Sequence, residues 1–462
     1  MSESLLVVSP AWGSGHSAGK PGALQTLRAV GYKLAWVGGF AALCWTAEGV
    51  EILAGGDFSL LSFFESRNIA YKDSGQAGNA LIFLQRHGIN TVRLRLFTSS
   101  ATQAQADPYN YINNLDYTLP LAARVKKAGL RLMLDFHYSD TWADPGHQRK
   151  PNAWTNLNFS RLVEQMRSYN SNCIAVLKSG GAMPDYVQVG NEITGGLLWP
   201  DGRVGGNYDN STQWSQLGLV LNAAIQGIKD ASGTVSPKII IHIDRGGDWA
   251  GTQWFFDNLR RQQVPFDIIG ESYYPFWHGQ LASLAHCLTN AALRYQKPVV
   301  IAETAFPWTN SVWTTNIVGL AGNPEGQVRF IAELASIVNR LPAGLGAGIV
   351  WWGAEYQQTP GVNEAGFNTT SFFDAQGNLL SVADALAGMA LGLRLSASSN
   401  GSALSLSWPM SGAGLSLTWA TNLGPSANWL PVANASQTNK AGFNVSVPLF
   451  SPGHRFFQLH SY

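Results

Sequence analysis

The sequence predicts an α/β fold, a (β/α)8 barrel of the TIM type, followed by a small C-terminal all-β domain. Three observations lead to this prediction. Eight short apolar, β-branched runs recur between residues 48 and 390, each followed by a polar loop and a helix-like stretch. Runs that are apolar throughout are typical of strands buried on both faces of a parallel sheet, and eight of them favour a closed barrel. From about residue 391, apolar and polar residues alternate between turn residues, as in antiparallel strands.

Residues 1–47 are expected to form a leader. Basic residues such as Lys33 precede an apolar stretch at 34–45, which is too short for the roughly 20 residues that span a bilayer. The pattern indicates a secretory signal peptide cleaved after Ala47, although Trp45 stands where a small residue normally precedes the cleavage site. A buried first helix is the alternative. We therefore expect a secreted protein, extracellular or periplasmic, with no membrane span in its mature form.

The barrel is expected to occupy residues 48–390. Segments 116–128 and 325–341 carry apolar residues at helical spacing, with Gly129 and Gly344 near their ends as stop signals. An open doubly wound sheet is the alternative, but no G-x-G-x-x-G follows the first run and no P-loop pattern occurs. The expected strands are VEILAGGDFS (50–59), GINTVRLRLF (88–97), LRLMLDFHY (130–138), YVQVGNEI (186–193), KIIIHID (238–244), FDIIGESYY (266–274), KPVVIAET (297–304) and GAGIVWWGAE (346–355).

Residues 391–462 predict a small β-sandwich. Short alternating runs such as LSLSW (404–408) and FNVSV (443–447) are separated by Gly, Pro, Asn and Ser. This segment is similar to the fibronectin-like tails of bacterial secreted enzymes. Trp408, Trp419 and Trp429 each lie in an apolar alternation, so we expect them to pack in the core of this domain instead of forming a sugar-binding face.

Composition excludes some ligands and favours others. The 462 residues include 30 Lys plus Arg and 29 Asp plus Glu, a net charge of +1, which gives no general field to attract nucleic acid. Charged residues make up only 13% of the chain, whereas aromatic residues reach 11%, with 17 Trp. A chain rich in aromatic rings and poor in charge suits neutral polar ligands with apolar faces, and sugars are the obvious class.

The three cysteines do not indicate a disulfide framework or a zinc site. Cys44, Cys173 and Cys287 are too few and too scattered for a disulfide scaffold or a thiolate zinc site. Cys44 would leave with the leader, and spacing does not decide whether Cys173 and Cys287 pair. We expect no metal and no cofactor.

Polar and aromatic residues gather at the ends of the expected strands. In a (β/α)8 barrel the carboxyl ends of all strands share one rim, where active sites are built. The rim residues are Arg93, Arg95, Asp135, His137, Asn191, Glu192, His242, Asp244, Tyr273, Tyr274, Glu303, Trp351 and Trp352.

Two glutamates stand out at this rim. Glu192 ends the fourth run and Glu303 ends the seventh, and a carboxylate at a buried strand end is costly unless it is paired. Two carboxylates on one rim are what acetal cleavage requires, one to protonate the leaving oxygen and one to stabilise or attack the oxocarbenium centre. The alternative is that either glutamate is a salt-bridge partner of a barrel arginine. Arg93 or Arg95, with Tyr273 or Tyr274, could keep Glu303 ionised.

Several long segments carry a family resemblance over residues 50 to 390. They include NTVRLRLF, DFHYSDTWADPGHQRKPNAW, VQVGNEITGGLLWP, IIGESYYPFWHG and VVIAETAFPW. With these, the chain resembles glycoside hydrolase family 53, the arabinogalactan endo-β-1,4-galactanases, which are retaining enzymes of a large barrel clan. The resemblance implies that Glu192 is the acid/base and Glu303 the nucleophile in the hydrolysis of β-1,4-galactosidic bonds.

Further roles follow from this interpretation. Asn191 is placed to hold the 2-hydroxyl of the bound sugar, with a turn-capping role as the alternative. Asp135, His137 and His242 would orient Glu192 or contact sugar hydroxyls, and for the histidines the alternative is a core ring bonded to a carbonyl. Tryptophans at or just beyond strand ends would stack on pyranose faces, Trp308 and Trp352 ahead of the rest. These tryptophans are Trp142, Trp249, Trp277, Trp308 and Trp352.

The sequence departs from the family in two places. Some bacterial members carry calcium in an Asp- and Gly-rich loop after the seventh strand, but the corresponding TAFPWTNSVWTTNIVGLAGNPEGQ has no acidic cluster, so we predict no calcium there. Asp140 and Asp144 are expected to form hydrogen bonds and not to bind a metal. Glu271 stands where the family leads us to expect an apolar residue, and it either perturbs the site or points outward.

Two alternative functions remain open from the sequence. One is another β-1,4-glycanase of the same clan, acting on mannan, xylan or glucan. The other is a non-catalytic carbohydrate-binding barrel, because a fold does not determine function. In either case the expected partner is a polysaccharide, with no nucleic acid, and the expected state is a monomer.

Overall fold

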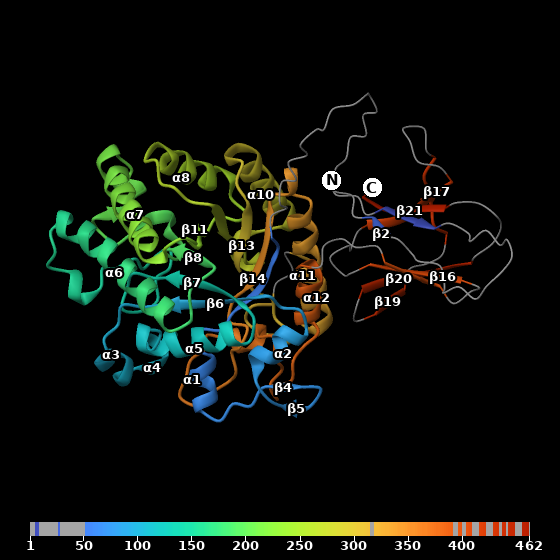
Figure 1. Ribbon diagram of the computed structural model, residues 1–462, viewed down its shortest axis with the longest axis horizontal. Helices are drawn as coiled ribbons and strands as arrows, with labels where there is room; N and C mark the ends of the chain where they lie inside the picture. Colours follow the sequence, from blue (N-terminus) through green and yellow to red (C-terminus); the bar gives the residue numbers. More distant parts are fainter. Residues whose placement is uncertain are drawn as a thin grey trace.

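A closed parallel barrel forms the larger part of the molecule. The computed structural model describes residues 51–314 and 318–390, the strands at 5–8 and 26–27, and short segments between 396 and 461. All eight predicted strands are present, and the last pairs with the first to close the barrel (Figure 1). In chain order they are β3 (Leu53–Asp57), β6 (Thr91–Leu96), β7 (Arg131–Phe136), β8 (Tyr186–Val189), β11 (Lys238–Ile243), β12 (Ile268–Ser272), β13 (Val299–Thr304) and β14 (Gly346–Trp351).

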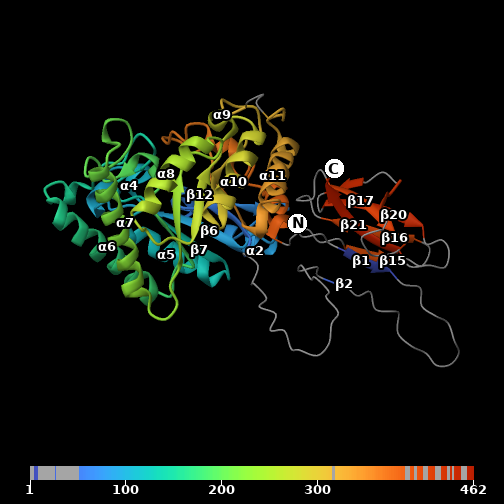
Figure 2. The ribbon, with the colours of Figure 1, turned by 90° about the horizontal axis from the view of Figure 1, so that it is seen from above.

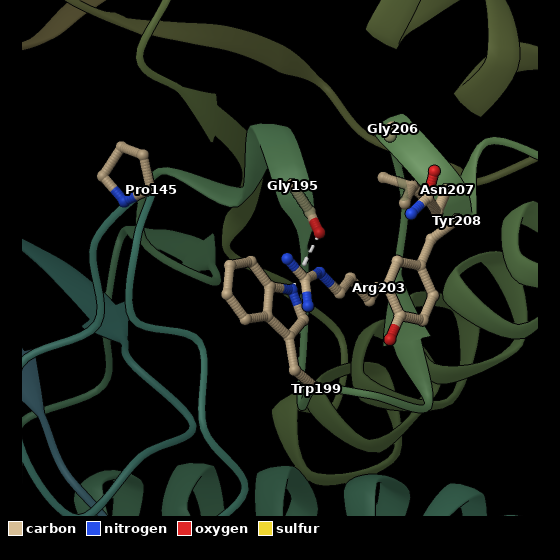
Figure 3. Close-up of a pocket in the computed structure, with 9 residues that line it drawn as sticks. Pro145, Gly195, Trp199, Arg203, Gly206, Asn207 and Tyr208 are labelled. Atoms are coloured by element: carbon tan, nitrogen blue, oxygen red, sulfur yellow. Dashed lines mark hydrogen bonds between the residues drawn. The ribbon is translucent and has the colours of Figure 1, made fainter.

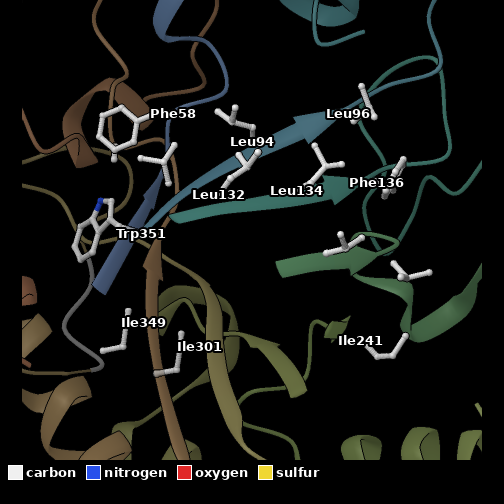
Figure 4. Close-up of a cluster of buried hydrophobic side chains, with 14 of the residues drawn as sticks. Phe58, Leu94, Leu96, Leu132, Leu134, Phe136, Ile241, Ile301, Ile349 and Trp351 are labelled. Atoms are coloured by element: carbon white, nitrogen blue, oxygen red, sulfur yellow. The ribbon is translucent and has the colours of Figure 1, made fainter. Parts of the chain in front are cut away.

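Side chains of these strands alternate between two apolar layers. Leu132 and Leu134 of β7 pack outward against the helices, whereas Met133 between them packs in the barrel interior with residues such as Ile240 and Val300. The outward layer is shown in Figure 4. Because both faces of each strand are covered, the strands read as continuous apolar runs. These continuous runs made the strands predictable from the sequence.

Helices surround the strands (Figure 2). The predicted helices at 116–128 and 325–341 are confirmed as α5 (Leu115–Lys127) and α11 (Pro324–Asn339). Asparagine side chains cap several helices; that of Asn114, for example, accepts the backbone N–H of Tyr117 and so satisfies a donor that the first turn leaves free. The other helices are α1 (Leu61–Ser66), α2 (Ala80–Arg86), α3 (Ala101–Ala106), α4 (Pro108–Tyr111), α6 (Phe159–Ser179), α7 (Ser211–Ser232), α8 (Trp249–Arg261), α9 (Pro275–His278), α10 (Leu281–Tyr295) and α12 (Val382–Ala390).

The C-terminal strands form two antiparallel sheets, as predicted. One contains β15 (Ser396–Ser399), β16 (Ala403–Trp408), β20 (Gly442–Pro448) and β19 (Gln437–Asn439). The other contains β18 (Leu430–Pro431), β17 (Leu415–Ala420) and β21 (Arg455–Ser461), extended by β1 (Leu5–Val8) and β2 (Thr26–Leu27). Trp408 is buried in the core of this domain and stacks on Phe443 with ring centroids 5.5 Å apart, which confirms its predicted packing role.

Of the expected leader at 1–47, the structure describes only β1 and β2. The apolar stretch at 34–45 of the expected leader lies outside the described residues. Within the described part of the chain, no helix is both long enough and apolar enough to cross a membrane. Cys173 in α6 and Cys287 in α10 are both buried and both free, so the two thiols do not pair.

Candidate active site

Strand β12 brings the two glutamates together. Glu303 lies near the end of β13 and is the register partner of Ser272 at the end of β12. The Ser272 hydroxyl in turn donates a 2.6 Å hydrogen bond to Glu192 Oε1, which follows β8. The negative charge of Glu303 contributes to raising the pKa of Glu192. The fold therefore gathers the two carboxyl groups at one end of the barrel, in electrostatic contact.

Glu192 has an unusual backbone conformation. Its φ of 48° and ψ of 50° lie in the left-handed region, which costs a non-glycine residue energy. Gly190, just before it, also has a positive φ of 92°. The chain thus turns sharply as it leaves β8, and the short 3₁₀ helix Ile193–Gly195 follows directly. Strain of this kind is concentrated at functional sites.

Glu303 is held by one cation and one hydroxyl. Arg93 Nη1 lies 2.7 Å from Glu303 Oε1, and the Tyr274 hydroxyl donates to Glu303 Oε2 at 3.0 Å. The sequence did not decide which arginine and which tyrosine support Glu303, and the structure shows that they are Arg93 and Tyr274. The Tyr273 hydroxyl instead donates to the Gly279 carbonyl at 2.7 Å, and Arg95 lies over the Trp142 ring at 4.2 Å.

Arg93 is the centre of a buried charge network. Besides Glu303, its guanidinium contacts Asp135 at 2.6 Å and Asp57 at 3.3 Å, and it donates to Asn191 Oδ1 at 2.9 Å. Burial works against its charge, but the three carboxylates outweigh burial and raise the pKa of Arg93. The same arginine helps to lower the pKa of Asp135 against the effect of burial. A buried ion network of this kind is stable only while every member is present.

The environment of Glu192 favours its protonated form. Burial, the charge of Glu303 and the charge of Asp244 together raise the pKa of Glu192 well above its ordinary value, and the Ser272 hydrogen bond opposes them. Burial, helped by the charges of Asp135 and Asp57, also raises the pKa of Glu303, but Arg93 opposes this rise through its charge and a direct hydrogen bond. The two carboxyl groups are thus held in different electrostatic surroundings, as an acid and a nucleophile must be.

A neutral histidine, His242, contacts the Ser272 hydroxyl. His242 Nε2 lies 2.8 Å from the Ser272 hydroxyl oxygen, and His242 Nδ1 lies 2.9 Å from Gln188 Nε2. Burial, then Arg93, lowers the pKa of His242 well below its ordinary value, so the ring is uncharged. His242 Nδ1 faces two donors, Gln188 Nε2 and the Glu192 backbone N–H at 3.4 Å, and one acceptor, Asn191 Oδ1 at 3.0 Å. Because the donors outnumber the acceptor, we assign the proton to Nε2. His242 then donates to Ser272, which donates to Glu192.

Asp135 and His137 form a second pair within the buried network. Asp135 Oδ1 accepts from Gln188 Nε2 at 2.6 Å, and Asp135 Oδ2 lies 3.0 Å from His137 Nε2. His137 Nδ1 accepts the backbone N–H of Ala143 at 2.8 Å. Their observed contacts are with protein groups, as are those of Arg93, Arg95, His242 and Tyr273, all fully or almost fully buried. Sugar contact by these side chains stays a prediction.

Asn191 joins the network to the rim. Its side-chain oxygen accepts from Arg93, and its Nδ2 donates to the Ala143 carbonyl at 2.8 Å. The side chain is therefore held at both ends beside Glu192. Its contact with a sugar 2-hydroxyl stays a prediction.

Aromatic rings line the same end of the barrel. Trp142 and Trp352 are partly exposed, with ring centroids 6.4 Å apart, and Trp352 packs edge-on against Phe367 at 4.3 Å. Trp308, also partly exposed, donates its indole N–H to the Asn368 carbonyl at 3.3 Å. Trp277 has 59% of its surface exposed. These rings are available for stacking, which stays a prediction for each.

Sequence analysis missed three residues of the network. Asp57, at the end of β3, contacts both arginines, Gln188 links Asp135 to His242, and Ser272 contacts Glu192. Asp57 and Ser272 are the last residues of their strands, so the rule that selected the other rim residues could have found them. Gln188 lies inside an apolar run, and the presence of one polar residue in a buried strand is the only feature of the sequence that indicates its role in the network.

Glu271 and Asp140 are hydrogen-bonded to groups other than the glutamate pair. Glu271 points outward, where its carboxyl accepts from the Thr252 hydroxyl of α8 at 2.9 Å and from the Arg245 backbone N–H at 3.1 Å. Asp140 accepts from Thr98, Gln103 and Asn152, in line with its predicted hydrogen-bonding role. Within the described residues, no group of three His, Cys, Asp or Glu side chains is arranged to hold a metal ion.

Comparisons with known proteins agree with this geometry. Residues 53–386 match the family model described as glycosyl hydrolase family 53. The arabinogalactan endo-beta-1,4-galactanase of Thermothelomyces thermophilus is 35% identical over 64% of this chain and 88% of its own length. A solved fungal beta-1,4-galactanase is 32% identical, covers 72% of this chain and 98% of its own, and has a TM-score of 0.64. The GH53 catalytic domain of Ignisphaera aggregans is 31% identical, covers 74% and 97%, and has a TM-score of 0.66. The chain belongs to glycosyl hydrolase family 53.

Proposed function

We propose that the protein is a retaining endo-β-1,4-galactanase in which Glu192 is the acid/base and Glu303 the nucleophile. One observation carries the proposal. Two carboxyl groups influence each other's charge at the carboxyl end of the barrel, yet Arg93 forms a 2.7 Å ion pair with Glu303, whereas Glu192 has no ion pair among the described residues. This asymmetry keeps a proton on Glu192 and a charge on Glu303, which is the starting state of a double displacement.

The first step breaks the glycosidic bond. Glu192 gives its proton to the glycosidic oxygen while a Glu303 oxygen attacks the anomeric carbon from the opposite face, so that a covalent glycosyl ester forms and the leaving chain departs as an alcohol. Glu192 becomes negatively charged when it gives up this proton. No repulsion between the two carboxyl groups results, because Glu303 becomes a neutral ester in the same step. Arg93 and Tyr274 hold the attacking carboxylate in position.

The second step restores the enzyme. Glu192, now ionised, takes a proton from a water molecule, whose oxygen attacks the anomeric carbon and releases Glu303. During this interval the charge on Glu192 is stabilised by the Ser272 hydroxyl and, behind it, by His242. Configuration at the anomeric carbon is retained, because two inversions occur.

Galactan is proposed as substrate because the similar proteins are galactanases by name. The test is release of reducing ends from a panel of β-1,4-linked polysaccharides: galactan, mannan, xylan and glucan. We expect hydrolysis of galactan in excess of the other three, with oligosaccharide products. Hydrolysis of mannan, xylan or glucan without hydrolysis of galactan would contradict the substrate, and hydrolysis of none would contradict the enzymatic function.

We also propose that the protein is exported and acts as a monomer, with residues 48–390 as the catalytic barrel and residues 391–462 as an appended domain. The basic and apolar pattern before Ala47 supports export. N-terminal sequencing of the protein recovered outside the cytoplasm should begin after Ala47, which would remove β1 and β2 from the sheet that they extend. A sequence that still contains these two strands would contradict the cleavage. Light scattering should give a mass near that of one chain, and a mass of two or more chains would contradict the monomer.

A further inference from the structure

A pocket lies on the loop that follows Glu192 in the chain. It has a volume of about 290 Å³ and is lined by Pro145, Gly195, Trp199, Arg203 and Tyr208, with a few neighbours (Figure 3). This volume is just below the roughly 300–1,000 Å³ typical of small-molecule sites, so it suits one sugar-sized group. Gly195 ends the 3₁₀ helix that begins directly after Glu192, which places the pocket on the same rim.

Arg203 lies between two aromatic rings in this pocket. Its guanidinium carbon is 4.2 Å from the centroid of Trp199 and 4.6 Å from that of Tyr208. Figure 3 shows the guanidinium between these rings. Stacked rings cover the planar surfaces of a guanidinium but leave its N–H edge available. The pocket therefore presents a fork of donors and a positive charge.

The acidic residues near Arg203 in the chain interact with side chains other than Arg203. Asp201 pairs with Lys150 at 2.6 Å, and the two oxygens of Asp209 accept the indole N–H groups of Trp214 and Trp254. Among the residues that the structure describes, no carboxylate lies within ion-pair distance of the Arg203 guanidinium. A cation held in an aromatic pocket without an acidic partner is suited to an anion from outside.

The pocket is built in advance. The Trp199 indole N–H donates to the Gly195 carbonyl at 2.8 Å, and the Trp199 backbone N–H donates to Gln148 at 2.7 Å. Gln213 Nε2 donates to the backbone carbonyl of Arg203 at 2.8 Å. Gln148 also donates to the backbone carbonyl of Asn191 at 2.7 Å, which connects the pocket wall to the catalytic rim. Such a preformed site loses little entropy on binding.

We infer that this pocket binds the carboxylate of a sugar acid carried by the substrate chain, with Arg203 as the residue that recognises it. The planar guanidinium fork matches a carboxylate in two parallel hydrogen bonds. A neutral sugar would leave the positive charge uncompensated, and one face of Trp199 is already covered by Arg203. The inference rests on the proposed function and adds to it a preference for galactan that bears uronic acid residues.

A pair of substrates that differ only in the carboxylate tests this inference. Pectic galactan with attached uronic acids is compared with the same polymer after its carboxyl groups have been reduced to alcohols. We expect the wild-type kcat/KM to be about tenfold higher on the acidic polymer, a factor that corresponds to about 1.4 kcal/mol. Added salt should reduce this ratio, because charge attraction is screened.

Variants assign the preference to Arg203. Arg203→Gln should hydrolyse both polymers with the same kcat/KM. Arg203→Lys should keep part of the preference, because it keeps the charge but loses the fork. Arg161→Gln removes the same charge from the exposed surface of α6 and should behave as wild type. Thermal unfolding of each variant checks that it is folded.

The outcomes separate the two proposals. Equal wild-type rates on both polymers, or a preference that survives in a folded Arg203→Gln, would overturn the carboxylate site and leave the galactanase function standing. Failure to hydrolyse even uncharged galactan would overturn the proposed function. Calorimetric titration with an acidic oligosaccharide and with its reduced counterpart measures binding without hydrolysis. Equal affinities for the two would independently overturn the carboxylate site.

Discussion

Replacing Ser272 with alanine is expected to extend activity to higher pH. The Ser272 hydroxyl donates a 2.6 Å hydrogen bond to Glu192 and so favours the ionised form of that carboxyl, which lowers its pKa against burial and the charge of Glu303. Without the hydroxyl, the pKa of Glu192 rises further. Because cleavage needs Glu192 protonated, the high-pH limb of the kcat/KM profile moves to higher pH.

The size of the shift follows from the kind of contact. A hydrogen bond to a charged group contributes about 1.5–3 kcal/mol, and we take the lower end because Glu192 is partly exposed. One pKa unit corresponds to about 1.4 kcal/mol, so the expected shift is about one pH unit. The low-pH limb, which reports ionisation of Glu303, should stay in place, because Ser272 is not hydrogen-bonded to that carboxylate.

The assay is a pH profile of initial rates on soluble galactan from pH 3 to about pH 10, for wild type and Ser272→Ala. Ser371→Ala is the matched control. Ser371 is likewise buried, directly after the 3₁₀ helix Phe367–Thr370, and donates to the Ala354 carbonyl at 2.7 Å, but it forms no hydrogen bond with Glu192. It should lose stability without moving either limb. A high-pH limb that stays fixed or moves to lower pH in Ser272→Ala would refute the assigned direction of this hydrogen bond.

Three further predictions concern buried charged groups of the barrel. Glu192→Gln and Glu303→Gln should each lower kcat on galactan by at least about 10²–10⁴-fold, and undiminished cleavage by either would remove that residue from the mechanism. Arg93→Met leaves buried carboxylates without their cation and should reduce the free energy of unfolding by about 3–5 kcal/mol in urea titrations; a loss below about 1 kcal/mol would show that the network does not stabilise the barrel. Burial raises the pKa of Glu271 well above its ordinary 4.5, so its contribution to stability is complete below about pH 4.5 and is lost as pH rises. Glu271→Gln should therefore gain stability relative to wild type between pH 4 and pH 8, and a difference independent of pH would contradict the assignment.

The strands could be predicted from sequence because burial acts on each of them locally. In β7, every residue after Arg131 is buried, so the run shows its environment without reference to any other strand. The same holds for β13, where all six residues are buried. The small C-terminal domain was predicted for the opposite reason: β16 alternates between buried and exposed positions, as a sheet with one covered face must.

The partners of Glu303 could be narrowed from the sequence only in part. Consecutive residues in an extended chain point to opposite sides, so only one of Tyr273 and Tyr274 could face the barrel, and the structure shows that it is Tyr274. Arg93 and Arg95 are two residues apart and point to the same side. Which of them reaches Glu303 depends on the stagger between β6 and β13, which are not neighbours in the sheet, and local sequence does not contain that information.

The stereochemistry of the first product tests the central claim most directly. Two carboxyl groups close enough for one to act as nucleophile give retention, whereas a pair separated by an extra water molecule gives inversion. Proton NMR spectra recorded in the first minutes of galactan hydrolysis distinguish the two anomers before they interconvert. We predict that the β-anomer appears first; initial appearance of the α-anomer would contradict the roles assigned to Glu192 and Glu303.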